Sequence, residues 1–146
     1  MRGPRGSITA RLAAGTRVLV IEDSLDIAEF LRAYFRASGY QLDHIDPADP
    51  ADAVESARAL DPHCILLDVS LRGFSGLDVY RLLHGDDAFA RVPVILLTGD
   101  TQAKLRSVGL ARAIDGHVAK PFSVSALAEL VAECVAAAQE DETEPS

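Results

Sequence analysis

The run Val18-Leu19-Val20-Ile21, which ends at Glu22-Asp23, is the stretch of sequence that decides the fold. Two further apolar runs have the same form. They are Cys64-Ile65-Leu66-Leu67, which ends at Asp68, and Val92-Pro93-Val94-Ile95-Leu96-Leu97, which ends at Thr98. Short β-branched and leucine runs without alternation are typical of parallel strands that are buried on both faces. The sequence therefore predicts three central strands, each ending in a polar side chain.

Weaker sequence patterns predict two further strands and the helices between the strands. Residues 41–46 alternate between polar and apolar, as expected of an edge strand, and 117–119 form a short strand before Lys120-Pro121. Helical patterns separate the strands, at about 27–39, 50–60, 76–83, 103–114 and 123–135, with Gly109 interrupting the fourth. Five strands that alternate with five helices predict a flavodoxin-like (βα)5 fold, a doubly wound parallel sheet of order 2-1-3-4-5.

Length and composition indicate one folded unit with short tails. The chain has 146 residues, of which 49% are hydrophobic and 25% charged. We expect a basic N-terminal tail at 1–16, a folded domain at 17–138 and an acidic tail at 139–146. No apolar stretch is long enough to span a membrane, and the first residues lack the apolar core of a secretory signal. Cys64 and Cys134 lie in apolar runs and read as buried hydrophobic residues, which favours a reducing cytoplasm.

The distribution of charge excludes some partners. The formal net charge is −8, and the four arginines near the front cancel the four acidic residues of the last seven, so residues 18–139 carry this charge. A body this acidic repels phosphate backbones. We therefore expect this domain to bind neither nucleic acid nor a membrane.

Five polar side chains follow the predicted strands and should meet at one edge of the sheet. They are Glu22, Asp23, Asp68, Thr98 and Lys120. Ligands of such sheets bind outside the carboxyl ends of the strands. Three carboxylates that converge repel one another unless a cation joins them, and Mg²⁺ prefers carboxylates, a carbonyl, water and a phosphoryl oxygen. The pattern favours phosphoryl transfer onto a carboxylate, with the metal and the lysine spreading the charge.

Each of these residues also has an ordinary interpretation. Asp23 after a strand is commonly a helix cap, Asp68 and Thr98 can cap a loop or a helix, and Lys120 alone is most often a solvated charge. Glu22 alone is more often a surface residue. The functional interpretation depends on all five falling at the same edge of one sheet.

The sequence around these positions resembles the receiver domains of response regulators. The similar segments are residues 18–24, 66–71, 97–99 and 120–122, in order, and the resemblance covers about residues 17–138. It implies that Asp68 accepts a phosphoryl group from a phosphohistidine, either of a sensor histidine kinase or of a phosphotransfer protein. It also implies that the fourth helix, fifth strand and fifth helix bind an unknown downstream protein.

The resemblance also implies roles for the other site residues. Asp23, Asp68 and the Ser70 carbonyl would hold Mg²⁺, with Glu22 acting mostly through water. Lys120 would pair with the phosphoryl group, Thr98 would move toward it, and the Lys120–Pro121 peptide bond would be cis.

Four positions depart from the family pattern. His117 stands where the family usually has a tyrosine or phenylalanine that turns inward on activation, so the switch pair would be Thr98 and His117. Gly99 replaces the commoner alanine, and Gly109 falls within the fourth helix. Arg72 replaces a proline, from which we expect a less fixed loop. We expect none of these to touch the acceptor, the metal carboxylates or the lysine, and we therefore expect the phosphorylation chemistry to be intact.

The sequence leaves other functions open. A receiver fold could serve as a scaffold that is never phosphorylated, although a scaffold needs no metal site. A phosphohydrolase with an aspartyl nucleophile usually has a second aspartate two residues later, where this chain has Ser70. We therefore expect no turnover beyond the protein's own phosphorylation and a slow dephosphorylation, at a rate set by Ser70 and Asp100. The chain could also be the N-terminal part of a longer response regulator.

Overall fold

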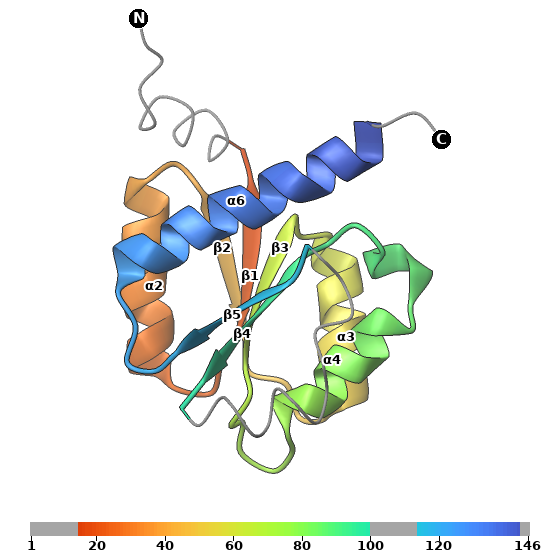
Figure 1. Ribbon diagram of the computed structural model, residues 1–146. Coiled ribbons are helices and arrows are strands. Elements are labelled where there is room, and N and C mark those ends of the chain that lie inside the picture. Colours follow the sequence, from red (N-terminus) through yellow and green to blue (C-terminus); the bar gives the residue numbers. More distant parts are fainter. Residues whose placement is uncertain (1–14, 100–113, 144–146) are drawn as a thin grey trace, which may run out of the picture.

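The computed structural model describes residues 15–99 and 114–143, without the side chains of 140–143. It contains a five-stranded parallel sheet in the order β2-β1-β3-β4-β5 (Figure 1). The strands are β1 (Arg17–Ile21), β2 (Gln41–Ile45), β3 (Cys64–Asp68), β4 (Val94–Thr98) and β5 (Gly116–Ala119). The helices are α2 (Leu25–Ala37), α3 (Pro50–Leu60), α4 (Gly76–His84), α6 (Val124–Thr143) and the short 3₁₀ helix η1 (Asp87–Phe89). The predicted fold class and strand order are confirmed.

Helices cover both faces of the sheet. Figure 1 shows α2 and α6 over one face and α3 and α4 over the other. Successive residues of β1 point to opposite faces, so that Val18 and Val20 pack in the core beneath α2 and α6, whereas Leu19 and Ile21 pack beneath α3 and α4. β1, β3 and β4 are thus buried on both sides, which explains why their sequences are apolar without alternation.

The predicted helix starts are confirmed by their caps. The Asp49 carboxylate accepts a hydrogen bond from the Asp52 N–H at 2.8 Å, and Pro50 is the first residue of α3. The Ser123 hydroxyl accepts from the Ala126 N–H at 3.2 Å at the start of α6. Both cysteines are free and buried, as expected. No helix of the described ranges is long and apolar enough to cross a membrane.

Some element boundaries differ from the predictions. β4 begins at Val94 rather than residue 92, because Pro93 has no N–H and the Val92 N–H is used in a turn to the Phe89 carbonyl. α6 continues to Thr143 and so includes part of the predicted acidic tail, where Gln139, Glu140 and Glu142 favour helix. The predicted helix at 103–114 lies outside the described residues apart from Ile114.

A buried aspartate holds the end of the sheet that is opposite the polar edge. The Asp115 carboxylate accepts hydrogen bonds from the Tyr80 hydroxyl (2.8 Å) and the Val94 N–H (2.9 Å), and it contacts His84 Nε2 at 3.0 Å. Asp115 thereby joins the last turns of α4 to the beginnings of β4 and β5.

Candidate functional site

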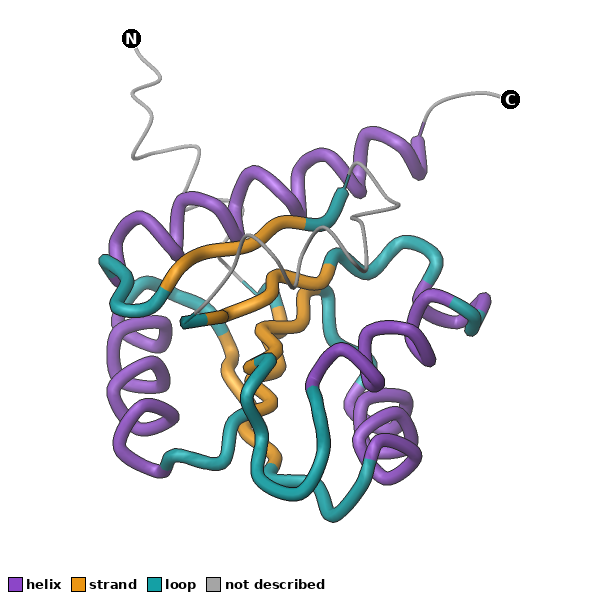
Figure 2. Tube along the Cα trace, turned by 60° about the horizontal axis from the view of Figure 1, so that its bottom comes forward, coloured by secondary structure: helices purple, strands orange, loops and turns teal. Residues whose placement is uncertain are grey.

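Strand register brings the predicted site residues to one edge. Asp68, the last residue of β3, pairs with Leu97 of β4, and Thr98 at the end of β4 pairs with Ala119 of β5. Glu22 follows β1 and Lys120 follows β5, so all these strands deliver polar side chains at the same level. This is the end of the sheet that comes forward in Figure 2.

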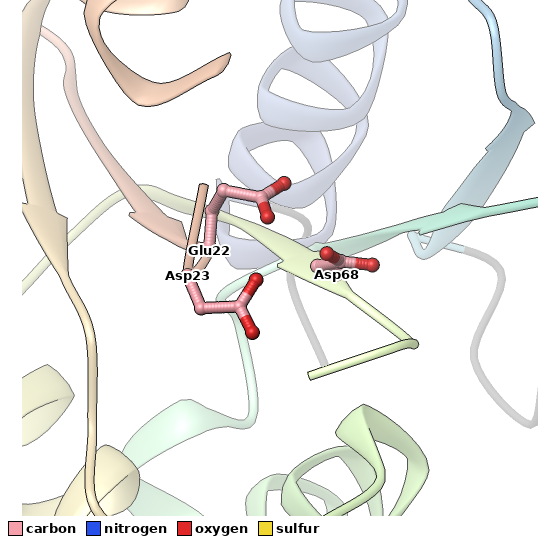
Figure 3. Close-up of side chains that lie close together, drawn as sticks. All are labelled: Glu22, Asp23 and Asp68. Carbon is pink, nitrogen blue, oxygen red and sulfur yellow. The ribbon is translucent and has the colours of Figure 1, made fainter. Parts of the chain in front are cut away.

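Three carboxylates gather at the ends of β1 and β3. Glu22, Asp23 and Asp68 each offer an oxygen, and these atoms lie within 4.8 Å of one another (Figure 3). The Glu22 and Asp68 residues are only 1% and 2% exposed, whereas Asp23 is partly exposed. Hard oxygen ligands this close are suited to a divalent cation such as Mg²⁺.

Lys120 supplies positive charge from the other side of Asp68. Its Nζ lies 3.1 Å from Asp68 Oδ1 and 3.9 Å from Glu22 Oε1. The Ser70 N–H also donates to Asp68 Oδ1, at 2.9 Å. The cis Lys120–Pro121 bond implied by the resemblance is present. Asp68 is therefore the carboxylate at which the lysine and the loop after β3 converge.

Burial and a neighbouring acid perturb Glu22. Burial, together with the closeness of Asp68, raises the pKa of Glu22 from 4.5 to about 7, against the opposing effects of the Ser24 N–H and of Lys120. The Ser24 N–H donates to Glu22 Oε2 at 3.1 Å, while Oε1 is buried and has no hydrogen-bond partner in the described part of the chain. An added cation would remove this unfavourable arrangement.

Arg72 ties the loop after β3 to Asp23. This contact corrects two expectations, that the loop is less fixed and that Arg72 does not touch a metal carboxylate. Its backbone N–H, which a proline would lack, donates to Asp23 Oδ2 at 2.8 Å. Its Nε–H donates to the same oxygen at 3.2 Å, and Nη2 donates to the Asp23 carbonyl at 3.2 Å. Partial burial raises the pKa of Asp23, but the bonds and charge of Arg72 outweigh it and hold that pKa below its ordinary value.

The two predicted switch residues have different surroundings. The Thr98 hydroxyl is buried and, among the described residues, has no hydrogen-bond partner. His117 lies on β5, pairs in register with Leu96 and is exposed. The structure thus brings Thr98 to the edge that carries Asp68, and it leaves His117 on the outer surface. Gly109 and Asp100 lie outside the described residues.

Gly76 is a residue of the site that sequence reasoning missed. A Cβ at this position would overlap the Asp68 carbonyl oxygen and would lie 2.9 Å from both the Asp68 carbonyl carbon and Val69 Cα. The Gly76 N–H also donates to the Val69 carbonyl, at 2.8 Å. The first residue of α4 therefore packs directly on the backbone of Asp68. The signal in the sequence was a glycine at the start of a predicted helix, where a side chain is normally tolerated.

Replacing Gly76 by alanine should lower the free energy of unfolding by about 1–3 kcal/mol, because backbone atoms must move to admit the methyl group. Urea unfolding followed by circular dichroism measures this change. Gly85→Ala is the matched control, because a Cβ there meets nothing nearer than 3.7 Å. Equal stability of the Gly76→Ala and wild-type proteins would contradict the packing described here.

The order of the sheet, with an acidic cluster and a lysine at its carboxyl edge, defines a flavodoxin-like α/β protein with a candidate metal and phosphoryl site. The family model of the response regulator receiver domain matches residues 18–132, and the chain belongs to this family. The chain is 35% identical over 130 residues to the DNA-binding response regulator MtrA of Mycolicibacterium smegmatis. That match covers 89% of this chain and 54% of the relative, so the chain spans about half the length of the curated relatives it matches.

Solved structures show the same fold. The receiver domain of a signal transduction histidine kinase from Syntrophus aciditrophicus has a TM-score of 0.75 and 26% identity, over 90% of this chain and 98% of that one. The receiver domain of the sensor histidine kinase PA1611 from Pseudomonas aeruginosa has a TM-score of 0.71 and 27% identity, over 84% and 99% of the two chains. The latter structure has a magnesium ion coordinated in its active site cleft.

Proposed function

We propose that this protein is a phosphorylation-dependent signalling module in which Asp68 is the phosphoacceptor. The observation that carries the proposal is the position of Asp68, which is buried at the end of β3 with Lys120 Nζ 3.1 Å from its Oδ1 and with Glu22 and Asp23 beside it. The donor is the phosphohistidine of a sensor histidine kinase or of a phosphotransfer protein. Incubation with acetyl phosphate and Mg²⁺ tests this, because one phosphoryl group should be added to the intact mass.

The transfer needs no group beyond these side chains, the donor and the cation. An Asp68 carboxylate oxygen attacks the phosphorus, the P–N bond to the donor histidine breaks, and its electron pair returns to the imidazole. Lys120 stabilises the charge on the phosphoryl oxygens. The buried Thr98 hydroxyl, which has no hydrogen-bond partner among the described residues, donates to one of these oxygens. The protein is thus a partner in one transfer and in its own slow dephosphorylation, with no external substrate turned over.

The residues fit Mg²⁺. Asp23, Asp68 and the Ser70 carbonyl would hold the ion, with Glu22 acting mostly through water. Two observations support this assignment: Glu22 Oε1 is buried with no hydrogen-bond partner within residues 15–99 and 114–139, and the three acids lie close together. When bound, the ion neutralises the acids and the incoming phosphoryl oxygens.

Mg²⁺ should stabilise the unphosphorylated protein. At a concentration ten times the dissociation constant, selective binding to the folded state adds about 1.4 kcal/mol, or about 3–6 °C in Tm for a domain of this size. Thermal unfolding with and without MgCl2, at ionic strength matched with NaCl, measures the shift. A Tm that does not respond to excess Mg²⁺ would contradict the metal site, and Asp23→Asn should reduce the response.

The output of the module is proposed from the resemblance to receiver domains. Thr98 and His117 are proposed as the switch residues, with the exposed His117 ring in the outward position in this structure. The partner is an unknown downstream protein that binds over the fourth helix, β5 and α6, the fourth helix lying outside the described residues.

The folded unit is proposed as residues 17–138, between the basic and acidic tails, and the proposed location is the cytoplasm.

A second candidate is the receiver part of a longer regulator. It is favoured by the coverage of MtrA, which is named as DNA-binding and is about twice as long as the matched region. In that case DNA binding belongs to another segment, because the described unit carries the acidic charge. A phosphorylation-independent scaffold is disfavoured by the buried Glu22 and Asp68 and by Lys120 beside them, because a scaffold needs no such site.

A further inference from the structure

The contact between Arg72 and Asp23 joins the loop between β3 and α4 to the residue that follows Glu22 after β1. All three hydrogen bonds come from one residue of the loop between β3 and α4, and two of them end on the same carboxylate oxygen, Oδ2 of Asp23. The Arg72 side chain is 84% exposed and the Asp23 side chain is 15% exposed. A full positive charge therefore lies at the outer side of a carboxylate that the proposed function assigns to the cation.

We propose that Arg72 is a competing cation for Asp23, which lowers the affinity of the site for Mg²⁺ and is released when the metal binds. This inference rests on the proposed function of the site. A guanidinium with its Nε 3.2 Å from Oδ2 repels a divalent cation that approaches the same carboxylate, and it uses electron pairs that the metal would otherwise coordinate.

The solvent exposure of the Arg72 side chain determines how strongly it lowers the affinity for Mg²⁺. A largely exposed ion pair contributes about 0.2–1 kcal/mol, which corresponds to a factor of about 1.5–5 in an equilibrium constant. Arg72 therefore tunes the metal affinity rather than blocking the site. Lys120 is different, because it is mostly buried, faces Asp68 and Glu22, and has a role in the transfer itself.

One substitution separates the contribution of the Arg72 side chain from that of its backbone N–H. Arg72→Gln removes the charge and the guanidinium but keeps the N–H that donates to Asp23 at 2.8 Å, so the loop stays attached. The matched control is Arg81→Gln, because Arg81 forms a similar exposed pair with Asp78 at 2.9 Å on the helix α4. Both substitutions change the net charge equally.

The test is the Mg²⁺ dissociation constant of the full chain, measured by isothermal titration calorimetry at low salt. Arg72→Gln should bind Mg²⁺ more tightly than wild type by a factor of about 1.5–5, and Arg81→Gln should bind like wild type. The difference should shrink as NaCl is raised, because the guanidinium is exposed. In wild type, the Arg72 Nε–H resonance should move toward that of a free guanidinium as Mg²⁺ is added.

The possible results distinguish the competing role of Arg72 from the proposed Mg²⁺ site itself. Equal or weaker binding by Arg72→Gln, with normal binding by wild type, would overturn the competing role and leave the metal site intact. If Arg81→Gln also bound Mg²⁺ more tightly than wild type, the gain in affinity would come from the change in net charge alone. That result would also overturn the competing role of Arg72. Failure of every form, wild type included, to bind Mg²⁺ would overturn the proposed metal site and the role of Arg72 with it.

Discussion

Asp68→Asn is expected to abolish labelling by acetyl phosphate, lowering the phosphorylated fraction to the background of the mass measurement. The amide is a poor nucleophile toward phosphorus, whereas the carboxylate it replaces lies beside Lys120 and ends a buried strand. The variant should still fold, because asparagine has nearly the same size and accepts the Ser70 N–H through its carbonyl oxygen.

Asp78→Asn provides the control for this experiment. Asp78 is an exposed aspartate on α4, and its loss should leave labelling at the wild-type level. An Asp68→Asn protein that still gained one phosphoryl group that hydroxylamine removes would show that another carboxylate is the acceptor and would contradict the proposed function.

Glu22→Gln is expected to stabilise the metal-free protein at alkaline pH. Burial and the adjacent Asp68 raise the pKa of Glu22 to about 7 in the folded protein, from 4.5 otherwise. The folded state therefore holds this proton more tightly than the unfolded chain does. The contribution of Glu22 to the free energy of unfolding is fully present below pH 4.5 and falls as the pH rises toward 7. Above pH 7 the free energy of unfolding is lower by about 3 kcal/mol than it is below pH 4.5.

Urea unfolding in EDTA at pH 5 and pH 8 measures this difference. Glu22→Gln should exceed wild type in free energy of unfolding by about 2–3 kcal/mol at pH 8 and by much less at pH 5, because the amide is uncharged at both. Glu29→Gln, at an exposed position of α2, should match wild type at both pH values. A Glu22→Gln protein no more stable than wild type at pH 8 would show that Glu22 is not held in an unfavourable charged state.

The strands and the positions of the acidic residues could be predicted because both depend on local sequence. The buried positions of β1, β3 and β4 are apolar except for Asp68 and Thr98, which end β3 and β4 directly. Once the strands are known to be parallel, their carboxyl ends must meet. The fold and the convergence of the acids then follow without knowledge of any side-chain contact.

Contacts between distant segments could not be predicted in the same way. Arg72 was expected to loosen its loop because proline was absent, yet the N–H gained by that absence bonds to a residue 49 positions away. Asp115 has no pattern around it that would indicate a buried carboxylate, because its partners Tyr80, His84 and Val94 come from two other elements. Gly76 is required by the path of the Asp68 backbone rather than by its own helix.

The closed form of the loop between Val69 and Gly76 makes it a suitable place for engineering. Its two ends are joined by the hydrogen bond from the Gly76 N–H to the Val69 carbonyl, and α4 is seated on the acceptor's backbone independently of what lies between. Residues inserted between Gly73 and Phe74 would lengthen a loop whose two ends are already joined. The entropic cost of closing a loop grows only slowly with its length. A reporter peptide placed there would stand next to the phosphoacceptor without displacing it.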